Sequence, residues 1–342
     1  MRAWQLMKHG EPARSLVLKE LPDLRPGAGQ VLIQSEGFGL NYADVMAVQG
    51  LYRDAPPVPC VLGYECVGRV SAVGQGVPHE LQGKRVVAMT RFGGYAEQAV
   101  TDHAAVAVIP DSIPLGEALA LATQGCTAWY MAMLACPLRA GQRVLVHSAA
   151  GGVGLLLVQL ALKRGCEVYA VASGAEKMAL LQATGAQHTI DRANASVHDQ
   201  LRQLLGAHQL DVSFNAVGGS TFKHDLALLG SGGALVLFGG AERGGSGSGF
   251  FGTLQFVWRM GLVVPIFLMM RSKSLIGVNM LRISEHKPEL ITECLRGVVQ
   301  AHREGWLRPH VHHTFSSIEL PTALQALGSG RTAGKVSVRW NG

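Results

Sequence analysis

The sequence predicts an α/β protein in which a β-rich, barrel-like domain made from both ends of the chain is joined to a doubly wound parallel sheet inserted between them. Short strand-like runs separated by Gly and Pro fill the first part of the chain. From Arg143 the pattern changes to strand, Gly-rich turn and helix, which is typical of βα units. Strand patterns return near the C-terminus. We therefore predict one domain from residues 1–118 and 281–342 and a second from residues 119–280, which a length of 342 residues accommodates.

Composition excludes several classes of protein. Hydrophobic residues make up 48% of the chain and charged residues 16%, below the usual ~25%, so the chain is not intrinsically disordered. The net charge of +6 is modest and no Lys/Arg-rich run occurs, which argues against nucleic-acid binding. The six cysteines form no Cys-x-x-Cys pair, and residues 1–10 lack the apolar core of a secretion signal. Both features favour the reducing cytoplasm.

The first domain is expected to consist mainly of strands. Alternating apolar runs predict strands at Gln30–Ser35, Cys66–Val73 and Arg85–Met89, with Gly- and Pro-containing turns between them. Pro114–Ala135 is rich in Leu, Ala and Met and predicts helix.

The second domain begins with its clearest βα unit. Arg143–His147 is an apolar strand, Ser148–Gly154 a Gly-rich turn and Leu155–Arg164 a helix, which Gly165 ends as a C′ residue. Glu167–Ala172 predicts the next strand. The same reasoning predicts further strands at Gln187–Ile190, Asp211–Asn215, Ala234–Phe238, Ser274–Met280, His312–Phe315 and Lys335–Arg339, and a helix at Pro288–Glu304.

An apolar insert lies near residues 246–272, after a Gly/Ser-rich segment at 240–249 that we expect to be mobile. Its uninterrupted part, Met260–Met270, has 11 residues, whereas a membrane-spanning helix needs about 20. A buried or lid helix is the favoured interpretation. The alternative is an interfacial helix, within residues 250–270, that contacts a membrane or an apolar substrate.

The turn after the first strand of the second domain predicts a dinucleotide site. It reads Ala149-x-Gly151-x-x-Gly154, where the small first residue permits the turn, Gly151 lets the backbone approach a pyrophosphate and Gly154 lets the helix pack closely. Gly152 and Val153 belong to the same helix N-terminus, which offers amide donors to an anion. An ordinary αβ turn is the alternative.

The end of the second strand predicts NADPH rather than NADH. NAD sites place Asp or Glu there to bind the ribose. This chain has Ser173, and two cations follow, Lys177 and Arg192. Either cation alone would fit a solvated surface charge equally well, but their joint placement without the acid favours a 2′-phosphate.

Several motifs together resemble the medium-chain dehydrogenases/reductases over nearly the full chain. Within that superfamily the chain is similar to the quinone oxidoreductases, and especially to the VAT-1-like branch. The motifs are Asn41-Tyr42-Ala43-Asp44, Gly63-Tyr64-Glu65, Gly83-Lys84-Arg85-Val86, Gly93-Gly94-Tyr95-Ala96-Glu97, residues 149–154, and Gly334-Lys335-Val336. The resemblance implies a GroES-like β-barrel catalytic domain plus a Rossmann NADPH-binding domain.

The resemblance also implies a zinc-independent site. The zinc enzymes of the superfamily carry Cys at the position of Asn41 and His at the position of Tyr64, and neither an amide nor a phenol replaces these zinc ligands. His310, His312 and His313 are better explained as a solvated strand edge than as metal ligands. We therefore expect no metal.

The expected reaction is hydride transfer from NADPH to a quinone or an α,β-unsaturated carbonyl compound. By resemblance, Asn41 and Thr127 lie beside the nicotinamide, and Tyr52 donates a proton or positions substrate, with a packing aromatic as its alternative. Asp44 and Glu65 are expected to orient backbone and Arg side chains. Further coenzyme contacts are expected at strand ends and by resemblance: Asn215, Val217, Phe238, Gly239, Gly240, Val278, Asn279, Met280 and Lys335.

Two other functions stay open. One is a VAT-1-like, membrane-associated protein that binds NADPH and turns over little. The other is an enoyl-thioester reductase, suggested by Tyr52. A homodimer joined along the edge strand at Ser274–Met280 is expected by resemblance, because an exposed apolar edge otherwise invites aggregation.

Overall fold

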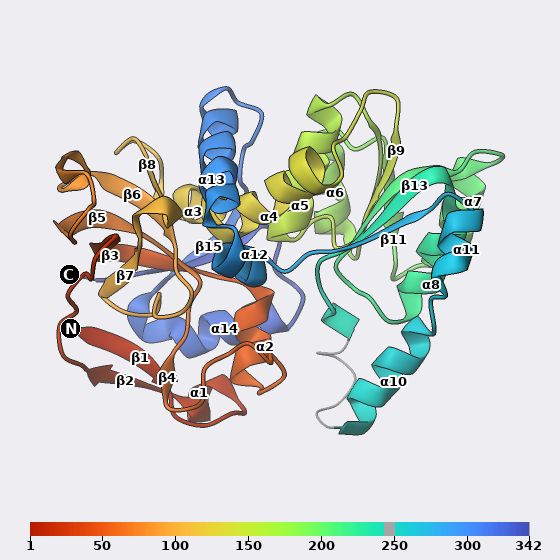
Figure 1. The fold of residues 1–342 in the computed structure, drawn as a ribbon. Helices are drawn as coiled ribbons and strands as arrows, with labels where there is room; N and C mark the ends of the chain where they lie inside the picture. Colours follow the sequence, from red (N-terminus) through yellow and green to blue (C-terminus); the bar gives the residue numbers. More distant parts are fainter. Residues whose placement is uncertain (243–249, 342) are drawn as a thin grey trace. The chain divides into compact units, whose positions relative to one another are not determined.

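The computed structural model describes residues 1–242 and 250–341 (Figure 1). The expectation of mobility for residues 240–249 falls largely on positions outside this description. The chain folds into two compact units. The terminal unit consists of Met1–Thr127 and Met280–Gly342, and the central unit consists of Ala128–Asn279. The first boundary therefore follows Thr127 rather than residue 118.

Two sheets form the framework of the terminal unit. Their strands are β1 (Arg2–Leu6), β2 (Leu16–Glu20), β3 (Gln30–Leu40), β4 (Cys60–Val61), β5 (Glu65–Val73), β6 (Arg85–Met89), β7 (Gln98–Asp102), β8 (Val106–Val108), β15 (Val311–Ser316) and β16 (Lys335–Arg339). The larger sheet has the order β15-β16-β3-β5-β6-β8, with β7 also paired to β3, and the smaller has the order β2-β1-β4. Apart from the parallel pair β15–β16, the strand pairs are antiparallel.

The register of β3 brings distant segments together. Leu40 pairs with Val336 of β16, and Phe38 pairs with Cys66 of β5. The end of β3, the start of β5 and the start of β16 therefore lie side by side, and this is where the terminal unit places its candidate site. The rings of Phe38 and Tyr95 pack in the core below, with centroids 4.7 Å apart.

Helices complete the terminal unit. They are α1 (Pro12–Ser15), α2 (Tyr42–Val48), η1 (His79–Leu81), η2 (His103–Ala105), α3 (Leu115–Ala120), η3 (Leu121–Gly125), α4 (Cys126–Trp129), α12 (Met280–His286), α13 (Pro288–Arg303), η5 (Ser317–Glu319) and α14 (Leu320–Gly328). The helical stretch predicted at 114–135 starts with α3, which packs on β3 and β16, and crosses the unit boundary in α4. This packing is why the boundary lies beyond residue 118.

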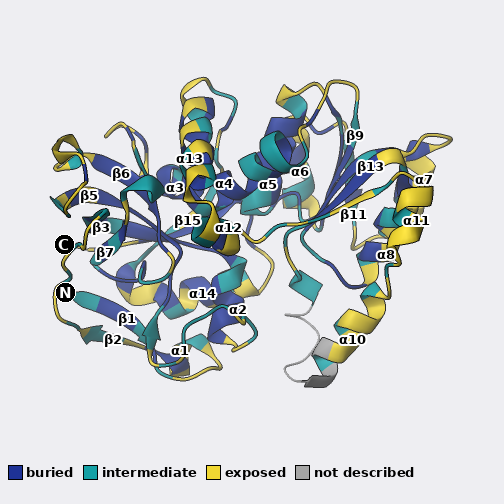
Figure 2. Ribbon diagram, in the orientation of Figure 1, coloured by how far each residue is buried: buried dark blue, intermediate teal, exposed yellow. Residues whose placement is uncertain are grey.

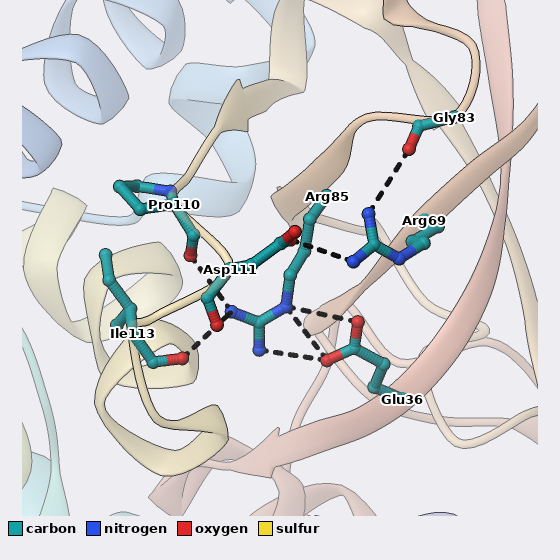
Figure 3. Close-up of polar contacts among 7 residues, drawn as sticks. All are labelled: Glu36, Arg69, Gly83, Arg85, Pro110, Asp111 and Ile113. Carbon is teal, nitrogen blue, oxygen red and sulfur yellow. Dashed lines mark hydrogen bonds and ion pairs between the residues drawn. The ribbon is translucent and has the colours of Figure 1, made fainter.

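A buried guanidinium ties three parts of the terminal unit together (Figure 3). Arg85 of β6 donates to the carboxylate of Glu36 at 2.9–3.1 Å. It also donates to the carbonyls of Pro110, Asp111 and Ile113 at 3.1, 3.3 and 2.8 Å. The segment that leads into α3 is thereby fixed to β3 and β6.

The central unit is a doubly wound parallel sheet, as predicted. Its strands are β9 (Arg143–Val146), β10 (Glu167–Ala172), β11 (His188–Asp191), β12 (Leu210–Asn215), β13 (Leu229–Leu237) and β14 (Ser274–Gly277), in the order β11-β10-β9-β12-β13-β14. Its helices are η4 (Tyr130–Ala135), α5 (Gly152–Lys163), α6 (Ala175–Thr184), α7 (Val197–Leu205), α8 (Ser220–Leu228), α10 (Phe250–Met260) and α11 (Pro265–Met270). The strand order reverses between β9 and β12, where ligands bind in sheets of this kind.

The interpretation of the apolar insert as a buried helix is wrong for this chain. In the described part of the insert, the chain forms α10 and α11, and most of their described residues are exposed (Figure 2). Trp258 is 78% exposed and Leu262 89% exposed. Hydrophobicity predicted burial, but among the described side chains of the insert those that pack on the core, Met260 and Val263, are only partly buried. Among the described residues, no helix has both the length and the hydropathy to cross a bilayer.

Candidate active site

Asn41 is placed by the junction of β3 and α2. It is the N-cap of α2, with an extended backbone, and its own N–H donates to Asp44 Oδ2 at 2.7 Å. The side chain is buried. The Asp44 carboxylate therefore orients backbone, as the sequence predicted, and it does so at Asn41 itself.

A buried ion pair adjoins the Asn41 amide. Glu65 at the start of β5 binds the ammonium of Lys335 at the start of β16, and both side chains are fully buried. Lys335 Nζ also donates to the Leu40 carbonyl at 3.2 Å and to Asn41 Oδ1 at 3.4 Å. Asn41 Nδ2 donates to Glu65 Oε1 at 3.1 Å. The expectation that Glu65 orients an Arg is wrong, because its cation is a Lys. The predicted coenzyme contact of Lys335 stays a prediction, and its ammonium is directed at Asn41 and Glu65.

The Glu65 carboxylate is also linked to Thr127, through the backbone of Thr123. Glu65 Oε2 accepts from the backbone N–H of Thr123, in the π-helical η3, at 2.8 Å. The Thr127 hydroxyl donates to the Thr123 carbonyl at 2.5 Å. Ala122 leaves the helical conformation (ψ −110°), so η3 is a kink that turns Thr123 toward Glu65. Two predicted site residues, Asn41 and Thr127, are thus joined through Glu65.

Tyr52 lies partly buried against the core of the terminal unit. Its ring is edge-on to that of Tyr64, with centroids 6.1 Å apart. Burial raises the pKa of Tyr52, and the Asp54 carboxylate raises it further. Burial likewise raises the pKa of Tyr64. Both phenols therefore remain protonated donors at neutral pH. The packing role of Tyr52 is visible, and its role in proton donation stays a prediction.

The residues at the zinc-ligand positions do not fit that metal. Asn41 is an amide and Tyr64 a protonated phenol, while Glu65 has both oxygens engaged and the Lys335 ammonium beside it. The nearby Cys66 is fully buried, and burial raises the pKa of its thiol to about 12. Across residues 1–242 and 250–341, no group of three or more His, Cys, Asp and Glu side chains could hold a metal ion.

In the central unit, the predicted dinucleotide turn has the required backbone. Ser148 has a positive φ of 52°, and the Gly151 N–H donates to the Ser148 carbonyl at 2.9 Å. Gly154 packs so closely that an added Cβ would lie 2.3 Å from the Ser148 carbonyl oxygen. Gly151 is the N-cap of α5, so the amides of Gly152 and Val153 belong to its first turn. The local geometry suits a pyrophosphate at this helix end.

The predicted 2′-phosphate residues gather at the ends of β10 and β11. Arg192 Nε donates to the Ser173 hydroxyl at 3.2 Å, and the Arg192 N–H donates to the Ala172 carbonyl. Burial lowers the pKa of Lys177, and the Arg192 guanidinium lowers it further. Two cations and a hydroxyl that lie this close together form a local positive field that suits an anion.

A buried polar network that sequence reasoning missed joins the end of β12 to α8 and to His147, which follows β9. Asn215 Oδ1 accepts from the N–H groups of Val217 and Gly218 at 2.8 Å each. Asn215 Nδ2 donates to Asp225, which also binds His147 Nε2 at 2.9–3.0 Å. His147 is 78 positions from Asp225 in the sequence, and the fold brings these two residues together.

The remaining predicted coenzyme contacts follow the same sheet edge. Phe238 N–H donates to the Asn215 carbonyl, and Gly239 approaches Ala216 so closely that a Cβ would lie 2.7 Å from its carbonyl oxygen. Val278 N–H donates to the Leu237 carbonyl and extends the pairing of β14. Gly240, Asn279 and Met280 continue these segments, and Met280 already belongs to the terminal unit.

Comparisons with known proteins agree with this architecture. A family model described as an alcohol dehydrogenase GroES-like domain matches residues 27–135, and one described as a zinc-binding dehydrogenase matches residues 152–296. The chain is 30% identical to a quinone oxidoreductase-like protein 2 homolog of Nematostella vectensis, over 91% of this chain and 82% of that protein. It is 29% identical to the human synaptic vesicle membrane protein VAT-1 homolog, over 91% of this chain and 79% of that protein.

A comparison with solved structures also finds a quinone oxidoreductase. The crystal structure of Escherichia coli quinone oxidoreductase complexed with NADPH aligns with a TM-score of 0.86. The alignment has 25% identity and covers 99% of this chain and 100% of that one.

Proposed function

We propose that this chain, which belongs to the quinone oxidoreductase family of the medium-chain dehydrogenases/reductases, uses NADPH to reduce quinones or α,β-unsaturated carbonyl compounds without zinc. Membership of the family rests on the relative that is 30% identical over most of both chains. The observation that carries the proposal is the Asn41 amide, held between Glu65 and Lys335 at the place of the zinc ligands. An amide donor can bind the oxygen on which charge develops during reduction.

The coenzyme would be held by the central unit. Residues 149–154 would face its pyrophosphate, and Ser173, Lys177 and Arg192 would face a 2′-phosphate. A bound reduced nicotinamide supplies a hydride to an electron-poor carbon. The NADPH in the Escherichia coli relative supports the choice of a nicotinamide coenzyme. The choice of NADPH over NADH rests on the two cations of this chain.

The terminal unit would act on the substrate. Asn41 Nδ2 would donate to the substrate carbonyl oxygen as negative charge builds on it. Tyr52, protonated at neutral pH, would orient the substrate or provide the proton that completes the reduction. Thr127 would orient the coenzyme amide next to these groups.

The test mixes purified protein and NADPH with a panel of quinones, enones and an enoyl thioester, and it monitors the oxidation of NADPH by its absorbance. We expect turnover with at least one quinone or enone, and a loss of about 100-fold in kcat for Asn41→Ala, the size expected for removal of one oxyanion donor. NADPH binding by that variant should persist in calorimetry. Absence of turnover across the panel with the wild-type protein would refute the proposal.

One observation favours a second activity, attachment to a membrane surface. The insert exposes apolar side chains, which we call the insert face: Leu254, Val257, Trp258, Leu262, Ile266, Phe267, Met269 and Met270. Exposed apolar patches commonly mark protein or membrane contacts. We propose that the insert face contacts a membrane surface and, separately, that two chains join along the edge strand β14 as a homodimer.

A further inference from the structure

Stability alone is a poor explanation for the ion pair of Glu65 and Lys335. Both side chains are fully buried, and burying two charges costs much of what their attraction returns. Apolar side chains of similar size commonly serve a protein core as well or better. The pair therefore calls for an explanation in terms of what it contacts.

The contacts of the pair converge on the candidate active-site residues. Asn41 Oδ1 faces the Lys335 ammonium at 3.4 Å, and Asn41 Nδ2 faces Glu65 Oε1 at 3.1 Å. The second oxygen of Glu65 holds the N–H of Thr123, whose carbonyl accepts from the Thr127 hydroxyl. One ion pair thus contacts both the amide of Asn41 and the backbone of Thr123, the residue that binds the Thr127 hydroxyl.

The two charges select one orientation of the Asn41 amide. An asparagine side chain has an acceptor oxygen and a nitrogen with two donor hydrogens. If the amide rotated by half a turn, its NH₂ group would face the Lys335 ammonium and its oxygen would face the Glu65 carboxylate, so both contacts would become repulsive. In the observed orientation, one Nδ2 hydrogen binds Glu65 and the second remains as a donor for another oxygen.

The neighbouring backbone leaves room for this arrangement. A Cβ at Gly39 of β3 would lie 2.1 Å from Glu65 Oε1 and 2.5 Å from Lys335 Cε. Any side chain at this position would displace the pair. The sequence of β3 therefore accommodates the two buried charges next to Asn41.

We propose that Glu65 and Lys335 are positioning residues with two tasks. They fix the Asn41 amide as a hydrogen-bond donor to the substrate oxygen, and they hold the helical segment from Thr123 to Thr127 in place. This inference rests on the proposed reductase function. It assigns Lys335 a role toward Asn41 rather than toward the coenzyme. It also explains why a charged pair, and not an apolar one, occupies this part of the core.

The kinetic test uses Glu65→Gln, Lys335→Met and the double variant Glu65→Gln/Lys335→Met. Each single variant leaves one buried charge unpaired, so we expect lower stability and a fall of about 100-fold in kcat, as for a misplaced catalytic group. The double variant removes both charges. We expect it to regain stability while kcat stays low, with the Kd for NADPH unchanged in all three.

The matched control is Glu36→Gln, which breaks a second, partly buried ion pair of the same unit, that of Glu36 with Arg85. In the part of the chain that the structure describes, Arg85 and its partners form no hydrogen bond or ion pair with Asn41, so this variant should lose stability and keep kcat. A double variant that regains both stability and kcat would show that the Glu65–Lys335 pair is only structural and would overturn the inference.

A second measurement does not depend on turnover. The side-chain amide resonances of Asn41 in ¹⁵N-labelled protein can be assigned by their loss in Asn41→Ala. We expect them to shift in the double variant and to stay in place in Glu36→Gln. Resonances that stay in place in the double variant would overturn the positioning role. A wild-type protein without turnover, but with the expected shifts, would instead refute the proposed function and leave the positioning role supported.

Discussion

Asp44 is the carboxyl group through which pH should act on the candidate site. It is fully buried beside Asn41, and burial raises its pKa from about 3.8 to about 7, although the hydrogen bond from the Asn41 N–H lowers it. Between pH 4 and pH 7 the carboxyl group of Asp44 is therefore protonated in the native protein and ionised in the unfolded chain. The free energy of unfolding should therefore fall as pH rises through this range, by about 4 kcal/mol in total, and the slope from this group should vanish above pH 7.

The variant Asp44→Asn tests this sign. Its side chain does not titrate but keeps an oxygen that can accept from the Asn41 N–H. Denaturant unfolding at pH 5, 6, 7 and 8 should show the wild-type protein losing stability relative to the variant as pH rises, with a constant difference above pH 7. Two curves that run parallel from pH 5 to pH 8 would contradict the raised pKa.

Lys177 and Arg192 should determine the choice of coenzyme. Charge-assisted hydrogen bonds to a phosphate are strong, so the variant Lys177→Ala/Arg192→Ala should weaken NADPH binding by roughly 10- to 100-fold. NADH lacks the 2′-phosphate, and its affinity should change little. Calorimetry with both coenzymes measures the two constants, and Arg202→Ala on α7 serves as a control for loss of a surface cation. Equal losses for NADPH and NADH would refute the assignment.

At the residue scale, the sequence could predict groups that act through a local motif. Asn41 and the turn at 149–154 stand within recognisable runs, and the structure places Asn41 and Gly151 at the N-termini of α2 and α5. The pair of Glu65 and Lys335 could not be predicted, because 270 positions separate the two residues. Only the register of β3 with β5 and with β16 brings them together.

At the scale of elements, the turn between β9 and α5 gives two glycines opposite roles. A Cβ at Gly154 would lie 2.3 Å from the Ser148 carbonyl oxygen, so Gly154→Ala should push α5 from β9 and lower the free energy of unfolding by about 1–3 kcal/mol. A Cβ at Gly151 would lie 3.1 Å from the same oxygen, which a small adjustment accommodates. Gly151→Ala should therefore cost less stability than Gly154→Ala but bind NADPH at least about 10-fold more weakly, because the methyl group occupies the path of the pyrophosphate.

Thermal unfolding and calorimetry on the two variants separate these roles. The expected pattern is a clearly lower Tm for Gly154→Ala, and a smaller fall in Tm with lost coenzyme heat for Gly151→Ala. Unimpaired NADPH binding by Gly151→Ala would show that the coenzyme does not approach the backbone at this turn.

Elements with a strong local pattern were also the ones that the sequence predicted well. The strands at 85–89, 167–172 and 335–339 have the predicted bounds, and α5 ends beside Gly165, whose φ is +76°. The helix α14 (Leu320–Gly328) was not predicted. The insert was misjudged because hydrophobicity alone cannot say whether another surface covers a helix.

At the scale of the whole molecule, the central unit exposes two features that invite association. The strand β14 is the edge of the six-stranded sheet, and Leu275 on it is partly exposed. The insert face precedes it in the chain. Arg271 is a basic residue of the insert, whereas Arg259 forms an ion pair with Glu242 and Lys273 Nζ donates to the Leu226 carbonyl. No acidic residue occurs between Glu242 and Glu285. A strand edge suits a second copy of the sheet, whereas an apolar face with positive charges suits an anionic lipid surface.

These two uses can be separated by one variant. Trp258→Ser/Leu262→Ser removes the two most exposed side chains of the insert face and leaves β14 intact. Each of the two substitutions removes about 1–2 kcal/mol of apolar burial in a membrane. The affinity for vesicles that contain phosphatidylserine, measured by flotation, should therefore fall by roughly 100-fold. The oligomeric state in sedimentation should not change. Leu204→Ser, which removes an exposed apolar side chain on α7, should keep both properties. If the wild-type protein never floats and the variant becomes monomeric, the insert face belongs to the dimer contact and the membrane proposal is wrong.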